Sequence, residues 1–108
     1  MLEYYRTLAD LLIELEKELR LMQLWEMQSP APEALASVEP FAVDQLSFNQ
    51  WLQFVFLPRM YALVESEASL PDNCSIAPMA EEFFKGQKVE AAAIISRLAA
   101  IDRLITNL

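Results

Sequence analysis

The sequence has no histidine, one glycine and one cysteine, and each shortage excludes a class of function. Without histidine the chain lacks the commonest general base and the commonest metal ligand. A single glycine, Gly86, excludes a glycine-rich loop that cradles phosphate groups. Cys74 has no second cysteine to pair with, which is typical of a reducing compartment, and no histidine to activate it, so we expect an inert thiol. We therefore expect no cofactor and no metal, and a non-catalytic function is favoured while an enzymatic one stays open.

Basic residues are also scarce, because eight Lys and Arg stand against sixteen Asp and Glu and leave a net charge of −8. Such a protein is repelled by nucleic-acid phosphates and by anionic lipid headgroups. Arg59 is the only basic residue between Arg20 and Lys85, so no basic patch is visible. We expect no direct binding to nucleic acid or to a membrane.

Long hydrophobic runs are absent as well. The longest stretch without a charged residue is residues 45–58, which is shorter than the roughly 20 residues of a membrane-spanning helix. The first residues, Met1 to Tyr5, show no basic region followed by an apolar one, so no secretory signal is expected. These features predict a cytoplasmic protein.

Apolar residues recur with helical spacing through most of the 108 residues, which predicts one all-α domain over 1–108, a bundle of about four helices. A long connector with three prolines, residues 28–44, is expected between the first and second helices. The expected helices are Tyr4–Met27, a short one at Pro32–Ala36, Ser47–Val64 with a kink or break at Pro58, Met79–Lys85 ended by Gly86, and a last one from Gln87 or Lys88 to Thr106.

The second long helix is the most apolar segment. Ser47 and Gln50 fit a capping box at its start. Its aromatic side chains lack the interleaved basic charge of a base-stacking platform. We therefore assign these side chains to the core: Phe48, Trp51, Phe54 and Phe56.

Gln53 and Arg59 are the polar exceptions in this apolar helix, and they form the candidate polar site. In one interpretation Arg59 pairs with a carboxylate such as Asp44 and ties the connector to the helix. In the other, both side chains line a pocket beside Pro58 in which Arg59 holds an anionic group of a small ligand.

A candidate partner surface lies at the end of the first helix. Leu21 and Trp25, four residues apart, point away from the main apolar stripe and are rimmed by Glu14, Glu18 and Glu26. An apolar centre with an acidic rim suits a protein partner with a basic rim. Whether the connector covers Leu21 and Trp25 is left open by the sequence.

Three segments of the chain resemble the YqcC-like family of small bacterial helical proteins of unknown function: Ser37–Phe41, Trp51–Met60 and Ile76–Pro78. The resemblance covers nearly the whole chain, and Trp-Leu-Gln followed by Pro-Arg-Met is its most specific part. It implies a small helical bundle with no established activity and no catalytic residues to carry over. Members are often encoded beside a tRNA pseudouridine synthase, and some carry that enzyme's name. Such an enzyme needs a much larger catalytic domain, so we do not expect this chain to be one.

Two hypotheses follow. The first is a non-catalytic protein-interaction module, an accessory to a tRNA-modifying enzyme for which a tRNA pseudouridine synthase is the candidate. The alternative is a small-ligand or substrate pocket, catalytic or not, near Gln53 and Arg59. The first is favoured because it needs only an apolar surface, whereas the second needs a cavity lined by both side chains. The sequence leaves the oligomeric state open.

Overall fold

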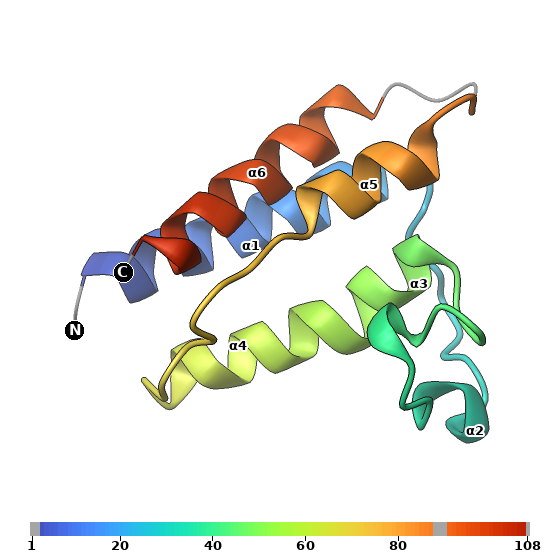
Figure 1. The fold of residues 1–108 in the computed structure, drawn as a ribbon, viewed down its shortest axis with the longest axis horizontal. Coiled ribbons are helices and arrows are strands. Elements are labelled where there is room, and N and C mark those ends of the chain that lie inside the picture. Colours follow the sequence, from blue (N-terminus) through green and yellow to red (C-terminus); the bar gives the residue numbers. More distant parts are fainter. Residues whose placement is uncertain (1–2, 88–90, 108) are drawn as a thin grey trace.

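The computed structural model describes residues 3–87 and 91–107. Two long helices, α1 (Glu3–Leu21) and α6 (Ala92–Thr106), lie side by side and supply the centre of the core (Figure 1). The third long segment of the core, residues 48–65, runs beneath them in this view. No described residue lies in a strand, so the predicted all-α fold is confirmed, with four helices longer than seven residues. The helices are α1 (Glu3–Leu21), α2 (Pro32–Leu35), α3 (Phe48–Trp51), α4 (Leu57–Glu65), α5 (Ala77–Phe84) and α6 (Ala92–Thr106).

The predicted apolar stripes of α1 and α6 form the core. Leu8, Leu12 and Leu15 of α1 have no exposed surface, and neither do Leu98 and Ile101 of α6. Complete burial of such a side chain is worth about 1.5–3 kcal/mol. α1 packs against both α6 and α4, and α5 packs against α6, so α1 and α6 hold the other helices in place.

α1 ends at Leu21, and the prediction of a helix to Met27 is wrong. Gln23 adopts a left-handed conformation with φ 60°. The Leu24 N–H donates to the Leu19 carbonyl at 2.9 Å, which is the long hydrogen bond of a Schellman motif. The chain therefore leaves the helix before Trp25, and Trp25 lies in the segment that follows.

The second apolar segment is α3, a π-helix at Leu52–Phe56 and α4 in succession. The predicted capping box is present, since the Ser47 hydroxyl accepts from the Gln50 N–H and the Gln50 side chain accepts from the Ser47 N–H. Pro58 has no N–H and its ring crowds the carbonyl four residues earlier. The wider π-turn accommodates this, and the coil continues into α4 without the expected break (Figure 1).

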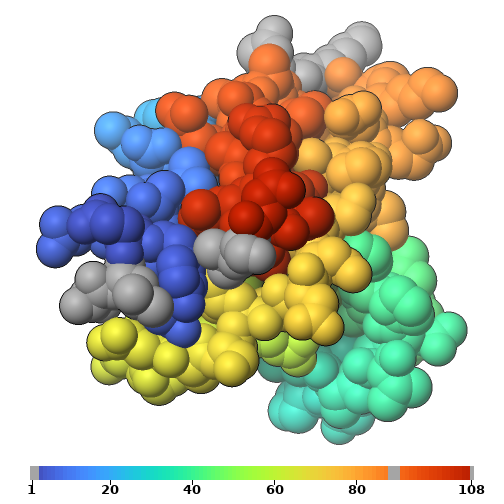
Figure 2. Space-filling view, turned by 60° about the vertical axis from the view of Figure 1, so that its left-hand side comes forward, coloured from blue at the N-terminus to red at the C-terminus, as the bar shows by residue number. Residues whose placement is uncertain are grey.

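The connector contains α2, which begins at Pro32 as predicted, and a 3₁₀ turn at Pro40–Ala42. Phe41 and Ala42 have φ of 57° and 49°, a left-handed conformation that costs about 1–3 kcal/mol for each residue. The turn brings the Phe41 ring edge-on to Trp51, with 4.8 Å between the centroids. The connector thus packs back on the molecule and forms one of its corners, below α5 (Figure 2).

Gly86 follows α5 with φ 79°, as predicted for a residue that ends a helix. α6 begins at Ala92, later than predicted, and Gln87, one of the two expected starts, is not helical. Lys88, the other expected start, lies outside the described residues.

The start of α5 is capped from another helix. Asp102 of α6 accepts the N–H of Ile76 and the N–H of Ala77, both at 2.8 Å to Oδ2. Because these donors have no partner within α5, the carboxylate both satisfies them and fixes α5 against α6.

Candidate functional site

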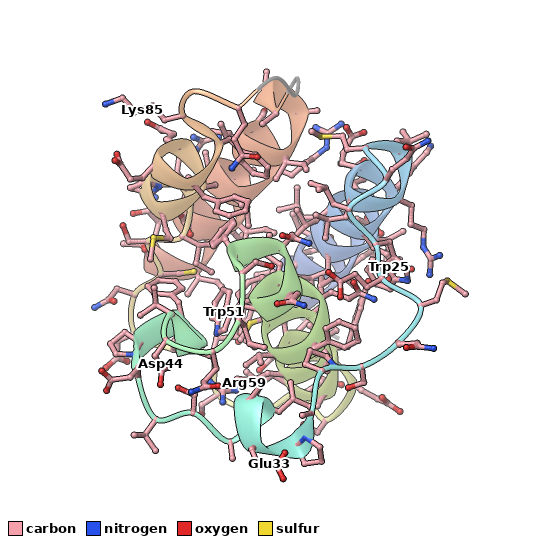
Figure 3. The ribbon with its side chains drawn as sticks, turned by 90° about the vertical axis from the view of Figure 1, so that its right-hand side faces the viewer. Trp25, Glu33, Asp44, Trp51, Arg59 and Lys85 are labelled. Carbon is pink, nitrogen blue, oxygen red and sulfur yellow. The ribbon has the colours of Figure 1, made fainter. Side chains whose placement is uncertain are left out.

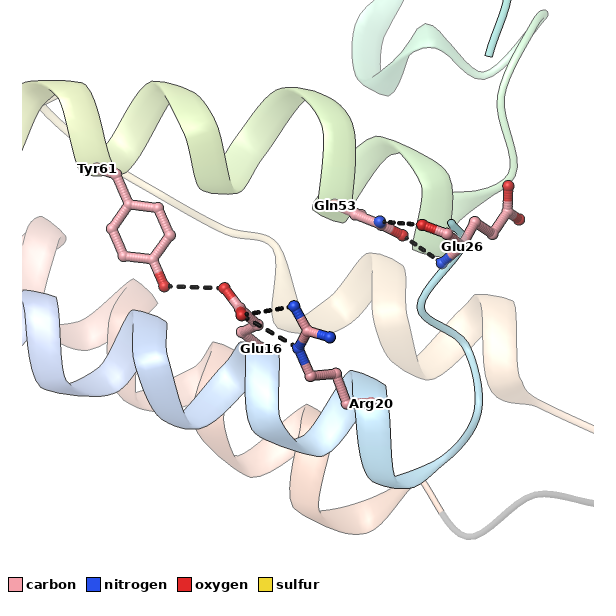
Figure 4. A network of polar contacts seen from close by, with 5 residues as sticks. All are labelled: Glu16, Arg20, Glu26, Gln53 and Tyr61. Atoms are coloured by element: carbon pink, nitrogen blue, oxygen red, sulfur yellow. Dashed lines mark hydrogen bonds and ion pairs between the residues drawn. The ribbon is translucent and has the colours of Figure 1, made fainter. Parts of the chain in front are cut away.

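Gln53 is a structural residue in this fold. Its side chain is only 7 % exposed. Its Oε1 accepts the Glu26 N–H at 2.8 Å, and its Nε2 donates to the Glu26 carbonyl at 2.7 Å (Figure 4). The side chain therefore holds the main chain just after α1.

Two neighbouring amides on the same helical segment complete this contact. The Asn49 Nδ2 donates to the Leu24 carbonyl at 3.2 Å, and the Gln50 Nε2 donates to the Glu26 carboxylate at 3.1 Å. We call Asn49, Gln50 and Gln53 the amide clamp. It fixes the segment that leaves α1, which explains a buried glutamine in an apolar helix.

Arg59 does not pair with Asp44, so that structural interpretation is wrong. Among the described residues, Arg59 has no hydrogen bond or ion pair, and it is exposed. Asp44 instead accepts from the Ser37 hydroxyl at 2.5 Å. This hydrogen bond lowers the pKa of Asp44.

Arg59 lines a cavity of about 380 Å³, but Gln53 does not. The two side chains of the candidate polar site are therefore not brought together. Most of the wall is apolar, and Arg59, Asn73 and Ser75 supply polar groups. The volume falls in the range of roughly 300–1,000 Å³ that is usual for small-molecule pockets.

Cys74 also lines this cavity, and its thiol donates to Asp102 Oδ1 at 3.1 Å. Burial raises the pKa of the Cys74 thiol, and the Asp102 carboxylate raises it further. A thiol held in its protonated form is a poor nucleophile, in line with the expected inertness.

The candidate partner surface on the first helix does not have the expected geometry. Leu21 is the last residue of α1 and is 68 % exposed. Trp25 is beyond the helix, is half-buried against the core, and is covered on one face by Arg20, whose guanidinium carbon lies 4.3 Å from the ring centroid. Figure 3 shows Trp25 on the opposite side of the molecule from Asp44. Trp25 therefore does not continue the helix face of Leu21.

The acidic rim of that surface is also partly neutralised. Glu14 Oε2 lies 3.1 Å from Arg97 Nε of α6. This contact is an ion pair without hydrogen-bond geometry, since that Nε has no hydrogen-bond partner among the residues that the structure describes. Glu16, which is not part of that rim, pairs with Arg20 and accepts from the Tyr61 hydroxyl (Figure 4). Glu18 is half-exposed.

The structure shows a second hollow that the sequence analysis did not identify. It lies between the connector and α5 and has a volume of about 230 Å³. We call it the connector cleft. The only hint in the sequence was the pair of apolar residues Phe41 and Val43 in a segment otherwise rich in proline. Its lining residues are Phe41, Val43, Leu46, Ser47, Phe48, Met79, Glu82 and Phe83.

Of the four aromatic side chains assigned to the core, Phe48 and Phe56 are buried, whereas Trp51 and Phe54 are half-buried.

Within residues 3–87 and 91–107, no group of three His, Cys, Asp or Glu side chains could hold a metal ion. None of the described helices is both long enough and apolar enough to span a membrane.

Comparison with known proteins identifies the family. The model of the DUF446 family, described as tRNA pseudouridine synthase C, matches residues 7–104. The chain belongs to the DUF446, or YqcC-like, family. The family resemblance of the sequence is thereby confirmed.

Two bacterial relatives are of similar length. An uncharacterized protein from Haemophilus influenzae is 40 % identical over 94 residues, which cover 87 % of this chain and 88 % of the relative. The uncharacterized protein YqcC from Escherichia coli K12 is 32 % identical over 93 residues, covering 86 % and 85 %. The solution NMR structure of YqcC from E. coli superimposes with a TM-score of 0.85 at 29 % identity, over 98 % of this chain and 91 % of that one.

Another relative is much longer. A protein from Pectobacterium carotovorum named tRNA pseudouridine synthase C is 39 % identical over 77 residues. These residues cover 71 % of this chain but only 20 % of that protein. DUF446 is therefore a family of unknown function with a link to tRNA pseudouridine synthase C.

Proposed function

We propose that this DUF446 chain is a non-catalytic interaction module that binds a tRNA pseudouridine synthase of the C type and serves it as an accessory. The observation that carries the proposal is the P. carotovorum relative, in which a homologous segment is a fifth of a protein with the synthase's name. Two modules in one polypeptide meet at a high effective concentration. Where they are separate chains, as proposed here, an interface has to supply the affinity.

The electrostatics of the chain favour the enzyme over its RNA substrate as the partner. With a net charge of −8, the chain is repelled by tRNA phosphates. An enzyme that binds tRNA carries basic surface to do so. Opposite charges on the two proteins would speed their encounter and favour the correct pairing.

The proposal is tested by titrating the purified chain into the separate synthase encoded in the same genome, with isothermal calorimetry at low and at physiological salt. We expect a saturable complex whose affinity falls as salt screens the charges, and a change in the rate of pseudouridine formation when the chain is added. In a gel shift, the chain alone should leave tRNA unshifted at physiological salt. Absence of binding to the synthase at tens of micromolar, or a salt-sensitive shift of tRNA by the chain alone, would overturn the proposal.

A second candidate function rests on the Arg59 cavity. An unpaired guanidinium beside an apolar wall of this size fits a small amphipathic anion. Titration with indole-3-acetate as a probe, followed by NMR shifts of residues around the cavity, tests this candidate. Saturable shifts that Arg59→Met abolishes would support it, and shifts that Arg59→Met leaves unchanged would reject it.

A further inference from the structure

We propose that the connector cleft is the surface that binds the synthase, and that the bound segment inserts one large apolar side chain flanked by Lys or Arg. This inference rests on the proposed function and deepens it by naming the surface and the chemistry of the partner. It also moves the partner surface from the end of α1 to the opposite side of the molecule.

The size of the cleft fits one side chain. Its volume of about 230 Å³ is below the roughly 300–1,000 Å³ of pockets for small-molecule ligands. It is also several times the roughly 30 Å³ that one water molecule occupies in the liquid. The volume of a single large apolar side chain lies between these limits. Side chains that fill a pocket in this way supply most of the binding energy of many interfaces.

The walls of the cleft are held in place before any partner binds. The Phe48 and Phe83 rings lie 5.6 Å apart, and Phe48 itself is buried. Phe41 is fixed by the left-handed turn and by its contact with Trp51. Unusual backbone conformations of this kind concentrate at functional sites, where they hold a side chain in position. A preformed cleft lowers the entropy cost of binding.

The cleft has an exposed apolar residue at its mouth and one carboxylate in its lining. Val43 is 62 % exposed at the mouth. Glu82 lines the cleft, and the exposed Asp44 follows Val43 in the connector.

The part of the chain that contains the connector and α5 is acidic. Residues 21–84 contain nine acidic residues and one basic residue, a net charge of −8 that equals the net charge of the whole chain. Arg59, the one cation, lines the neighbouring cavity and not the cleft. Lys85, at the end of α5, extends away from the molecule and from the connector (Figure 3). A segment that carries Lys or Arg is therefore the complementary partner for Glu82, which lines the cleft.

The face of α1 does not offer the same combination. Glu14 and Glu16 are each matched by an arginine, and Leu21 is an exposed apolar side chain at the end of the helix. Exposed single apolar side chains are normal on protein surfaces. The two surfaces therefore supply matched variants for a direct comparison.

The test measures synthase binding by four variants in the calorimetric titration. Val43→Ser removes apolar surface at the cleft mouth, and Glu82→Lys reverses a charge on its border. Leu21→Ser and Glu18→Lys make the same chemical changes on α1. All four side chains are at least partly exposed, and equal urea midpoints for variants and wild type check that each one folds.

We expect Glu82→Lys to weaken binding at least tenfold and to reduce its salt dependence, and Val43→Ser to weaken it about threefold to tenfold. The α1 variants should bind within twofold of wild type. Wild-type affinity in both cleft variants, or a loss confined to the α1 variants, would overturn this inference while the proposed function stands. Failure of the wild-type chain itself to bind would overturn both.

Discussion

The amide clamp predicts a specific stability cost for the loss of the Gln53 side-chain amide. Gln53 is 7 % exposed and makes two hydrogen bonds, of 2.8 and 2.7 Å, to the main chain of Glu26. Gln53→Met keeps the length of the side chain but removes both bonds. Each neutral hydrogen bond contributes about 0.5–1.5 kcal/mol net, so the free energy of unfolding should fall by about 1–3 kcal/mol.

The cost is measured by urea denaturation, as a lower midpoint at an unchanged slope. Gln28→Met is the matched control, because Gln28 is exposed and has no hydrogen bond among the described residues. Its effect should stay within about 0.5 kcal/mol. Equal midpoints for the two variants would refute the clamp.

Gln53→Glu adds a pH dependence to the same test. One oxygen of the new carboxylate can still accept the Glu26 N–H. Its other oxygen would replace the Nε2 that donates to the Glu26 carbonyl at 2.7 Å, so two acceptors would face each other. Burial and this carbonyl should raise the pKa of the new carboxyl group above that in the unfolded chain. Since a raised pKa favours the folded state at low pH, the variant should lose stability relative to wild type as pH rises from 5 to 8. A constant difference between the two proteins over this range would contradict the buried position.

Three further predictions concern helix ends and the thiol. Gln23→Gly should raise the free energy of unfolding by about 0.5–1 kcal/mol. The left-handed conformation of Gln23 costs roughly 1–2 kcal/mol, which exceeds the roughly 0.4–1 kcal/mol by which the extra conformational entropy of glycine stabilises the unfolded chain. A lower urea midpoint would contradict this. Asp102→Asn should cost about 1.5–3 kcal/mol, because a neutral amide replaces the carboxylate that accepts the first N–H groups at α5, and an unchanged thermal midpoint would count against that role. Cys74 should react with iodoacetamide at pH 8 more slowly in the native protein than in urea, because its pKa is raised in the fold. Equal rates would show an ordinary exposed thiol.

The parts of the fold that local sequence patterns encode were predictable. The stripe from Leu8 to Leu19 and the stripe from Ile94 to Ile105 specify buried helix faces. Ser47 and Gln50 specify a capping box within four residues of each other. The left-handed position of Gly86 follows from the conformational freedom of glycine at a helix end.

The end of α1 was harder to predict, because its left-handed residue is not glycine. The end of α4 was predicted at Val64 and lies at Glu65, although a left-handed residue follows there as well. Gln23 and Glu67 have φ of 60° and 53°, and hydrogen bonds close both turns. The usual signal for such an end is glycine, so nothing in the sequence marked the end of α1 before Trp25. Because the helix ends at Leu21, Trp25 does not share a helix face with Leu21.

The candidate site depends on contacts between residues far apart in the sequence. Gln53 reaches Glu26, Asp102 reaches Ile76, and Glu14 reaches Arg97. The sequence marked Gln53 and Arg59 as exceptional but could not show that they serve different places. The connector cleft combines residues 41–48 with residues 79–83, and only the packing of α5 against the rest of the molecule brings them together.

The most direct test of the account is an NMR titration of the ¹⁵N-labelled chain with the unlabelled synthase. The account predicts that amide signals of residues 41–48 and 79–83, which line the connector cleft, shift or broaden first. Signals of the exposed α1 residues Ile13 and Leu21 should change least. Perturbation centred on α1, or a spectrum unchanged at saturating synthase, would contradict the account.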